Sequence, residues 1–204
     1  MKTLIIIPTI GKNLDNLYNE EIVQKCITSI ENNTDENDYE IYLAINDYIG
    51  FAYGVNLGLH EFLNNPYYQD FDGVAIITDD VEITDKEWLT LFRNAGLGLV
   101  IQDAAEDQLY SGMACCYIPK EIIEKVGLFD EQFRIAEWED IDWCIRLKQA
   151  GYKIIGIQKQ ISSHGESPTR KNAPDWAKEE IKKNKERFRE KWKNKPEFLK
   201  KVGM

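Results

Sequence analysis

Short apolar runs alternate with amphipathic segments along most of the chain. The apolar runs have the length of buried strands, and they cover residues 2–8, 40–45, 73–78, 97–102, 112–118 and 153–157. Apolar residues at three- and four-residue spacing predict helices at 20–32, 50–63, 85–95, 120–126 and 139–150. Because strands and helices alternate with short links, the pattern predicts an α/β fold with a mostly parallel sheet covered by helices.

Polar residues follow the first three predicted strands directly. They are Pro8 and Thr9, Asn46 and Asp47, and Asp79 and Asp80. In an open parallel sheet, ligands bind beyond the carboxyl ends of the strands. We therefore expect these three pairs to converge on one crevice.

The end of the chain differs in charge from the rest. A basic amphipathic helix is predicted over 175–192, with apolar positions at Trp176, Ile181, Phe188 and Trp192. The net charge of −10 divides into +7 over residues 170–201 and −17 elsewhere. We expect a domain over 1–169 and a helical extension over 170–204. The helix either docks its aromatic stripe onto the domain or lies on an anionic membrane, whereas the acidic body disfavours nucleic acid binding.

The composition of the 204 residues is that of an ordinary globular protein. The apolar run from Leu4 to Ile7 stops at Pro8, short of the roughly 20 residues of a membrane-spanning helix, so we expect a cytoplasmic location. Four cysteines lie among apolar neighbours without zinc-site spacing, which predicts buried, reduced thiols. They are Cys26, Cys115, Cys116 and Cys144.

Two acidic elements are candidates for chemistry. Asp79 and Asp80 follow a buried strand, where they either start a turn or offer oxygen ligands to a divalent cation. A second group of acids begins the helix at 139–150 and suits the helix dipole. Within it, Asp142 lies four residues before Arg146, which predicts a surface ion pair. Asp140 shares a face with apolar residues, and this partial desolvation makes it the candidate general base.

The chain has two histidines. His60 falls in the middle of a predicted helix, and we expect it to be an exposed bystander. His164 follows the last predicted strand in a polar stretch, from which its imidazole could reach the same crevice as Asp80.

Six segments, in this order, resemble family 2 glycosyltransferases of the GT-A fold, particularly the branch that includes rhamnosyl- and galactofuranosyl-transferases. They are IIIPTIGKN at 5–13, GFAYGVNLGL at 50–59, AIITDDVEIT at 75–84, GMACCYIPKEIIEKVGLFDEQF at 112–133, EWEDIDWCIRLKQAGYKI at 137–154 and SSHGES at 162–167. The match spans nearly all of residues 3–167.

The resemblance implies a site for a nucleotide sugar. Pro8 and Thr9 would lie beside the nucleobase, and Asp47 would meet the base or ribose. The loop at 50–54, beginning with Gly50, and Asn56 would pack near the nucleotide.

The resemblance also implies a metal site and a base. Asp79 and Asp80 resemble the family's DxD element, although Thr78 stands in place of its first acid. That difference leaves Asp80 as the ligand of Mn²⁺ or Mg²⁺ and makes Asp79 a ribose contact or a support for the metal site. His164 would complete the metal site, and Asp140 would be the base.

These features predict a metal-dependent, inverting glycosyltransferase that moves a sugar from a UDP-, GDP- or dTDP-sugar to a glycan or another hydroxyl-bearing acceptor. An alternative is a degenerate transferase domain that binds a sugar nucleotide or glycan. A sugar-phosphate nucleotidylyltransferase is a further alternative, but these enzymes resemble one another in a Gly-rich, Arg-containing loop after the first strand. Here that place holds Pro8, Thr9, Ile10 and Gly11. Trp138 and Trp143 flank the base, where each could stack on a sugar or belong to the core.

Overall fold

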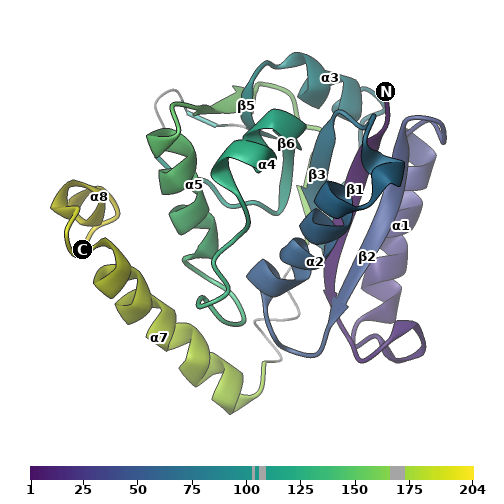
Figure 1. The fold of residues 1–204 in the computed structure, drawn as a ribbon. Coiled ribbons are helices and arrows are strands. Elements are labelled where there is room, and N and C mark those ends of the chain that lie inside the picture. The colour runs from purple at the N-terminus through teal and green to yellow at the C-terminus, as the bar shows by residue number, and fades with distance from the viewer. Residues whose placement is uncertain (103, 106–108, 166–172) are drawn as a thin grey trace.

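The computed structural model describes residues 1–102, 104–105, 109–165 and 173–204. The strands are β1 Thr3–Ile10, β2 Tyr39–Asn46, β3 Gly73–Ile77, β4 Val81–Ile83, β5 Gly98–Gln102, β6 Cys115–Pro119, β7 Lys153–Ile157 and β8 Ser162–His164. The helices are α1 Glu20–Asn33, α2 Phe51–Asn64, α3 Trp88–Asn94, α4 Lys120–Val126, α5 Glu139–Gln149, α7 Asp175–Trp192 and α8 Pro196–Lys201 (Figure 1). Short 3₁₀ helices lie at Leu14–Asn16 and Pro66–Tyr68.

The central sheet has six strands in the order β2-β1-β3-β6-β5-β7. The pairs β1–β2, β1–β3 and β5–β7 are parallel, and β6 runs antiparallel to both of its neighbours. The predicted α/β fold with a mostly parallel sheet is confirmed. The predicted helix at 85–95 begins only at Trp88, because the Asp85 carboxylate accepts the backbone N–H of Glu87 in a preceding turn.

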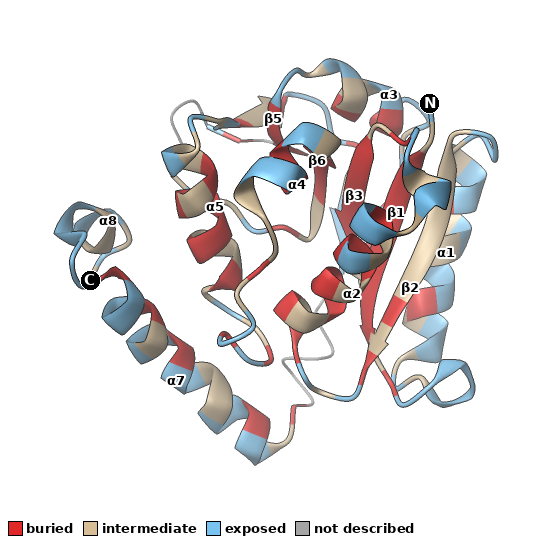
Figure 2. Cartoon of the chain, viewed as in Figure 1, coloured by how far each residue is buried: buried red, intermediate tan, exposed pale blue. Residues whose placement is uncertain are grey.

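Helices cover both faces of the sheet, and their outer faces are exposed (Figure 2). Strand β1 is buried on both sides: Leu4 and Ile6 pack with α2, α4 and α5, while Ile5 and Ile7 pack with α1 and α3. A continuous apolar run is what such a doubly covered strand requires.

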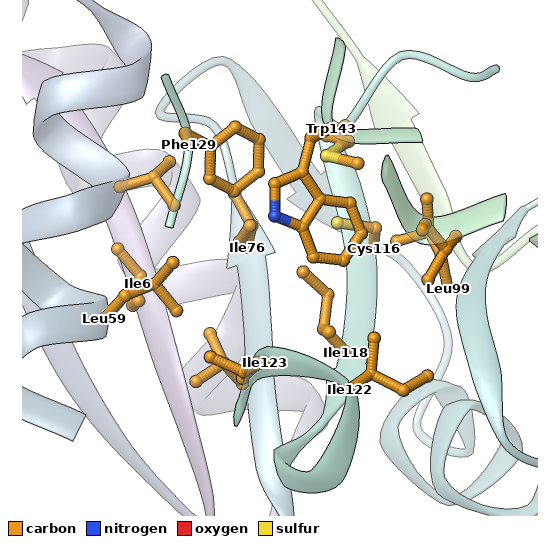
Figure 3. Packing of buried hydrophobic residues seen from close by; sticks show 14 of the residues in the cluster. Ile6, Leu59, Ile76, Leu99, Cys116, Ile118, Ile122, Ile123, Phe129 and Trp143 are labelled. Atoms are coloured by element: carbon orange, nitrogen blue, oxygen red, sulfur yellow. The ribbon is translucent and has the colours of Figure 1, made fainter. Parts of the chain in front are cut away.

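The core on the α2, α4 and α5 side is closed by two stacked rings. Phe129 and Trp143 lie with their ring centroids 5.5 Å apart above Ile76 and Ile118 (Figure 3). The indole N–H of Trp143 donates to the backbone carbonyl of Gly127, so this residue belongs to the core.

A second, two-stranded sheet pairs β4 with β8 and was not predicted from the sequence. Its antiparallel register sets His164 opposite Val81. The sequence predicted that His164 follows the last strand in a polar stretch, but it ends strand β8. This strand was missed because residues 162–164 are polar and lack the apolar pattern by which strands are recognised.

Helix α7 packs against the first turns of α5 and the chain segment before them (Figure 1). Phe188 and Trp192 are buried with Phe133 and Ile145. The aromatic stripe of the helix is therefore docked onto the domain, as the first of the two alternatives predicts. Trp176 instead is 57% exposed. The predicted boundary at 169/170 lies outside the described residues.

Candidate functional site

A cavity of about 260 Å³ opens beyond the carboxyl ends of β1, β2 and β3. Its walls come from segments far apart in sequence, and it lies where ligands bind in open α/β sheets. It is lined by Pro8, Thr9, Ile10, Asn46, Tyr48, Gly50, Phe51, Thr78, Asp79, Asp80, Gly112, Met113, Ala114, Ile135, Ala136, Glu139, Asp140 and His164.

Asp79 forms the floor between β1 and β3. Its carboxylate accepts a hydrogen bond of 2.6 Å from the hydroxyl of Thr9, and the residue is buried. Burial raises the pKa of the Asp79 carboxyl to about 6. The bond with Thr9 fixes the two predicted nucleotide contacts against each other.

Asp80 and His164 face each other across the second sheet. His164 Nε2 lies 3.2 Å from Asp80 Oδ1, and the Asp80 side chain is only 7% exposed. The hydroxyl of Thr78 donates to the same Oδ1 at 2.7 Å, and the backbone N–H of Gly165 donates to the carbonyl of Asp80. This framework holds one carboxylate and one imidazole at a fixed separation.

The donor set of Asp80 and His164 fits a divalent cation. Two neighbouring ligands of an octahedral cation, each about 2.1 Å from the metal, are about 3 Å apart, close to the separation in the structure. Within the described ranges, no group of three or more His, Cys, Asp or Glu side chains could hold a metal. A cation here would need further ligands besides these two side chains.

Two carboxylates enter the cavity from the first turn of α5. Glu139 is buried and lines the cavity beside Asp140. Asp140 Oδ1 accepts a hydrogen bond of 2.8 Å from the backbone N–H of Ile141. The helix N-terminus favours negative charge at both positions.

The segment before α5 has an unusual backbone. Ile135, Glu137 and Trp138 have φ values of 68°, 75° and 78°, a region that non-glycine residues rarely occupy. Ile135 forms a bridge with Gly50, and the carbonyl of Ile135 accepts the N–H of Phe51 at 2.8 Å. Gly50 is required here because a Cβ would lie 2.6 Å from the Ile135 nitrogen.

Two predicted nucleotide contacts, Asp47 and Asn56, are not among the residues that line the cavity. Asp47 is exposed, and its carboxylate accepts a hydrogen bond of 2.8 Å from the hydroxyl of Tyr18. Asn56 is buried, and its amide donates to the Phe129 carbonyl and accepts the Phe129 N–H. Asn56 thus braces the chain after α4, outside the cavity wall.

Asp142 corrects another expectation. Its predicted ion pair with Arg146 forms, with Nε 3.0 Å from Oδ2, but the carboxylate is fully buried rather than on the surface. Lys191 and the indole of Trp192 contact its other oxygen at 2.7 and 3.0 Å. The i,i+4 spacing predicted a solvent-exposed ion pair, but helix α7 covers the Asp142 carboxylate.

Sequence reasoning missed several residues of the cavity wall. Tyr48 lines it with a φ of 54°, and its ring contacts those of Tyr18 and Trp176. Met113 lies on the wall ahead of β6. Neither carries a local signal, because only the folded chain brings it to the cavity. Trp138 packs against Phe188, and His60 is exposed as expected.

No protein-family model and no curated protein matches this chain. Solved structures match its fold at low sequence identity. A mutant of Drosophila β-1,4-galactosyltransferase 7, in complex with manganese, UDP-Gal and xylobiose, aligns with a TM-score of 0.60 and 14% identity over 86% of this chain and 75% of the other. The chain has the GT-A glycosyltransferase fold.

Two further solved structures match the fold of this chain. S. aureus TarS aligns with a TM-score of 0.58 and 9% identity over 79% of this chain but 36% of its own. A197 from STIV aligns with a TM-score of 0.53 and 17% identity over 82% and 87% of the two chains.

Proposed function

We propose that this GT-A chain is a metal-dependent, inverting glycosyltransferase that transfers a sugar from a nucleoside-diphosphate donor to a hydroxyl group. One observation carries the proposal: a single cavity gathers Asp80, His164 and Asp140, which come from β3–β4, β8 and α5. The two ends of that cavity offer the two kinds of group that such a transfer needs, namely cation ligands and a carboxylate base.

The donor end is formed by the carboxyl ends of the first three strands together with β8, which carries His164. Pro8 and Thr9 line the cavity and would lie beside the nucleotide, and Asp79, which accepts a hydrogen bond from Thr9, would contact the ribose. Asp80 and His164, whose side chains lie 3.2 Å apart, would hold the divalent cation, Mn²⁺ or Mg²⁺. When bound, the cation offsets the charge that develops on the leaving diphosphate. Asp47 and Asn56 are not assigned a direct contact.

The acceptor end lies at the first turn of α5. Asp140 removes the proton from the acceptor hydroxyl as its oxygen attacks the anomeric carbon. The new glycosidic bond forms while the bond from that carbon to the diphosphate oxygen breaks. Attack from the face opposite the leaving group inverts the anomeric configuration, the diphosphate takes the bonding electrons, and Asp140 keeps the proton.

The Drosophila neighbour supports the class of partners, since it is described in complex with manganese, UDP-Gal and xylobiose. For this chain we propose a UDP-, GDP- or dTDP-sugar donor and a glycan or other hydroxyl-bearing acceptor. The segments at 75–84 and 137–154 favour family 2 and its rhamnosyl- and galactofuranosyl-transferase branch.

No helix among the described residues is long and apolar enough to cross a membrane. A cytoplasmic location and contact of basic α7 with an anionic membrane stay predictions.

A panel of nucleotide sugars incubated with MnCl₂ or with EDTA tests this function. We expect release of a nucleoside diphosphate from one donor, dependent on the metal and accelerated by a hydroxyl acceptor. The alternative function is a domain that only binds a sugar nucleotide or glycan. Tight nucleotide binding without turnover of any donor would favour that alternative and contradict the proposed transferase.

A further inference from the structure

Asn184 on α7 is a fully buried polar residue remote in sequence from the site. Its side-chain nitrogen donates to the backbone carbonyls of Arg134, Ala136 and Glu137 at 2.8, 2.8 and 3.2 Å. Its side-chain oxygen accepts the backbone N–H of Arg134 at 3.2 Å and is also contacted by Arg187. The one side-chain amide of Asn184 thus bonds to backbone carbonyls and to a backbone N–H of the segment 134–137.

The segment 134–137 needs such an external hold. It contains two residues with positive φ, and one of them, Ile135, is β-branched and strongly disfavoured there. A strained backbone persists only where its surroundings fix it. Ile135 and Ala136 form part of the cavity wall, and the chain then passes directly into Glu139 and Asp140.

A second set of contacts fixes α7 to the helix that carries Asp140. The buried carboxylate of Asp142, two residues further along α5, is contacted by Lys191 and Trp192 of α7. Phe188 packs on Phe133, immediately before the strained segment. Helix α7 therefore contacts the chain both before and after Asp140.

We propose that Asn184 is a positioning residue that sets the placement of Asp140 by holding the strained segment 134–137. This inference rests on the proposed function, in which Asp140 is the base. The metal end of the cavity is built from β3, β4 and β8, whereas the hydrogen bonds of Asn184 run to residues 134–137 and to Arg187, so the two ends are expected to respond differently to its loss.

Asn184→Asp and Asn184→Ala test the role. The Asp variant keeps the shape of the side chain and removes its N–H donors, whereas the Ala variant removes the whole amide. Asn64→Ala is the control, because the amide of Asn64 also donates to a backbone carbonyl, that of His60 at 2.8 Å, at the end of α2 that is farther from the cavity. Calorimetric titration with UDP, GDP or dTDP plus MnCl₂ would count the competent molecules in each sample.

Steady-state transfer is then expressed per competent molecule. A displacement of about 1 Å can cost about 100-fold in rate, so we expect kcat to fall by about 10- to 100-fold in both Asn184 variants. The KM for the donor and the nucleotide affinity should stay within about threefold of wild type, as in Asn64→Ala.

Three results would overturn the proposal. Wild-type kcat per competent molecule in both variants would reduce Asn184 to a fold-stabilising residue, and so would failure of both variants to fold. Absence of transfer by the wild-type protein would instead remove the proposed function, and this inference with it.

Discussion

His164 Nε2 lies 3.2 Å from Asp80 Oδ1, although 84 residues separate the two along the chain. The register of β8 on β4, with His164 opposite Val81, produces this contact. The polar strand β8 thus brings an imidazole beside Asp80, the second aspartate of the DD pair.

Replacing Asp80 or His164 should weaken the metal-dependent binding of nucleotide. Asp80→Asn and His164→Ala are expected to weaken Mn²⁺-dependent binding of UDP, GDP or dTDP by about tenfold or more, because each change takes away one of the two proposed protein ligands. Isothermal titration with and without MnCl₂ measures this. His60→Ala, at the exposed second histidine, should bind like wild type. Unchanged binding by both site variants would place the cation elsewhere.

Gly50→Ala should destabilise the protein. Gly50 has φ 142° and ψ 169°, a conformation that is nearly exclusive to glycine, and a Cβ would meet the Ile135 nitrogen. We expect a loss of about 1–3 kcal/mol in the free energy of unfolding, measured by urea denaturation. Gly112→Ala is the control, since a Cβ at Gly112 meets nothing within 4 Å. Equal stability of the two variants would mean that the Gly50–Ile135 bridge is absent in solution.

Trp192→Phe should loosen α7 from α5. The change keeps an aromatic ring but removes the N–H that donates to the buried carboxylate of Asp142. Hydrogen bonds to charged groups contribute about 1.5–3 kcal/mol, and we expect a loss of that size in urea unfolding. Trp176→Phe changes a ring that is 57% exposed and should stay within about 0.5 kcal/mol of wild type. A neutral Trp192→Phe would argue against the docked helix.

The four thiols should be inert in the folded protein. Burial raises the pKa of Cys26, Cys115 and Cys144 to about 12 and that of Cys116 well above its ordinary value. Because the thiolate is the reactive form and these pKa values are raised, the thiols stay protonated from pH 7 to 9. We expect no rapid reaction with Ellman's reagent in that range and four reactive thiols after unfolding in guanidinium. A thiol that reacts within seconds in the native state would contradict this burial.

The architecture could be predicted because hydrophobic burial leaves a pattern in the sequence. The run Leu4–Ile7 is apolar at every position, since both faces of β1 are covered. The placement of Asp79 and Asp80 at the sheet edge followed from the strand before them. These signals are local, so one chain segment is enough to interpret them.

The parts that escaped prediction depend on contacts between distant segments. Strand β8 is polar and is defined only by its pairing with β4. Asn184 resembles any other polar residue of a charged helix, yet it is buried by the segment it holds. Asp142 has the spacing of a surface ion pair, and only the docking of α7 removes it from solvent.

The most direct test of the proposed transferase is the turnover of Asp140→Asn at saturating donor and acceptor. General base catalysis contributes about 10²–10⁴-fold, so we predict a fall of that size in kcat with Mn²⁺-dependent nucleotide binding unchanged. Asp70→Asn, at an exposed carboxylate outside the cavity, should transfer at the wild-type rate. Full transfer activity in Asp140→Asn would contradict the assignment of Asp140 as the base.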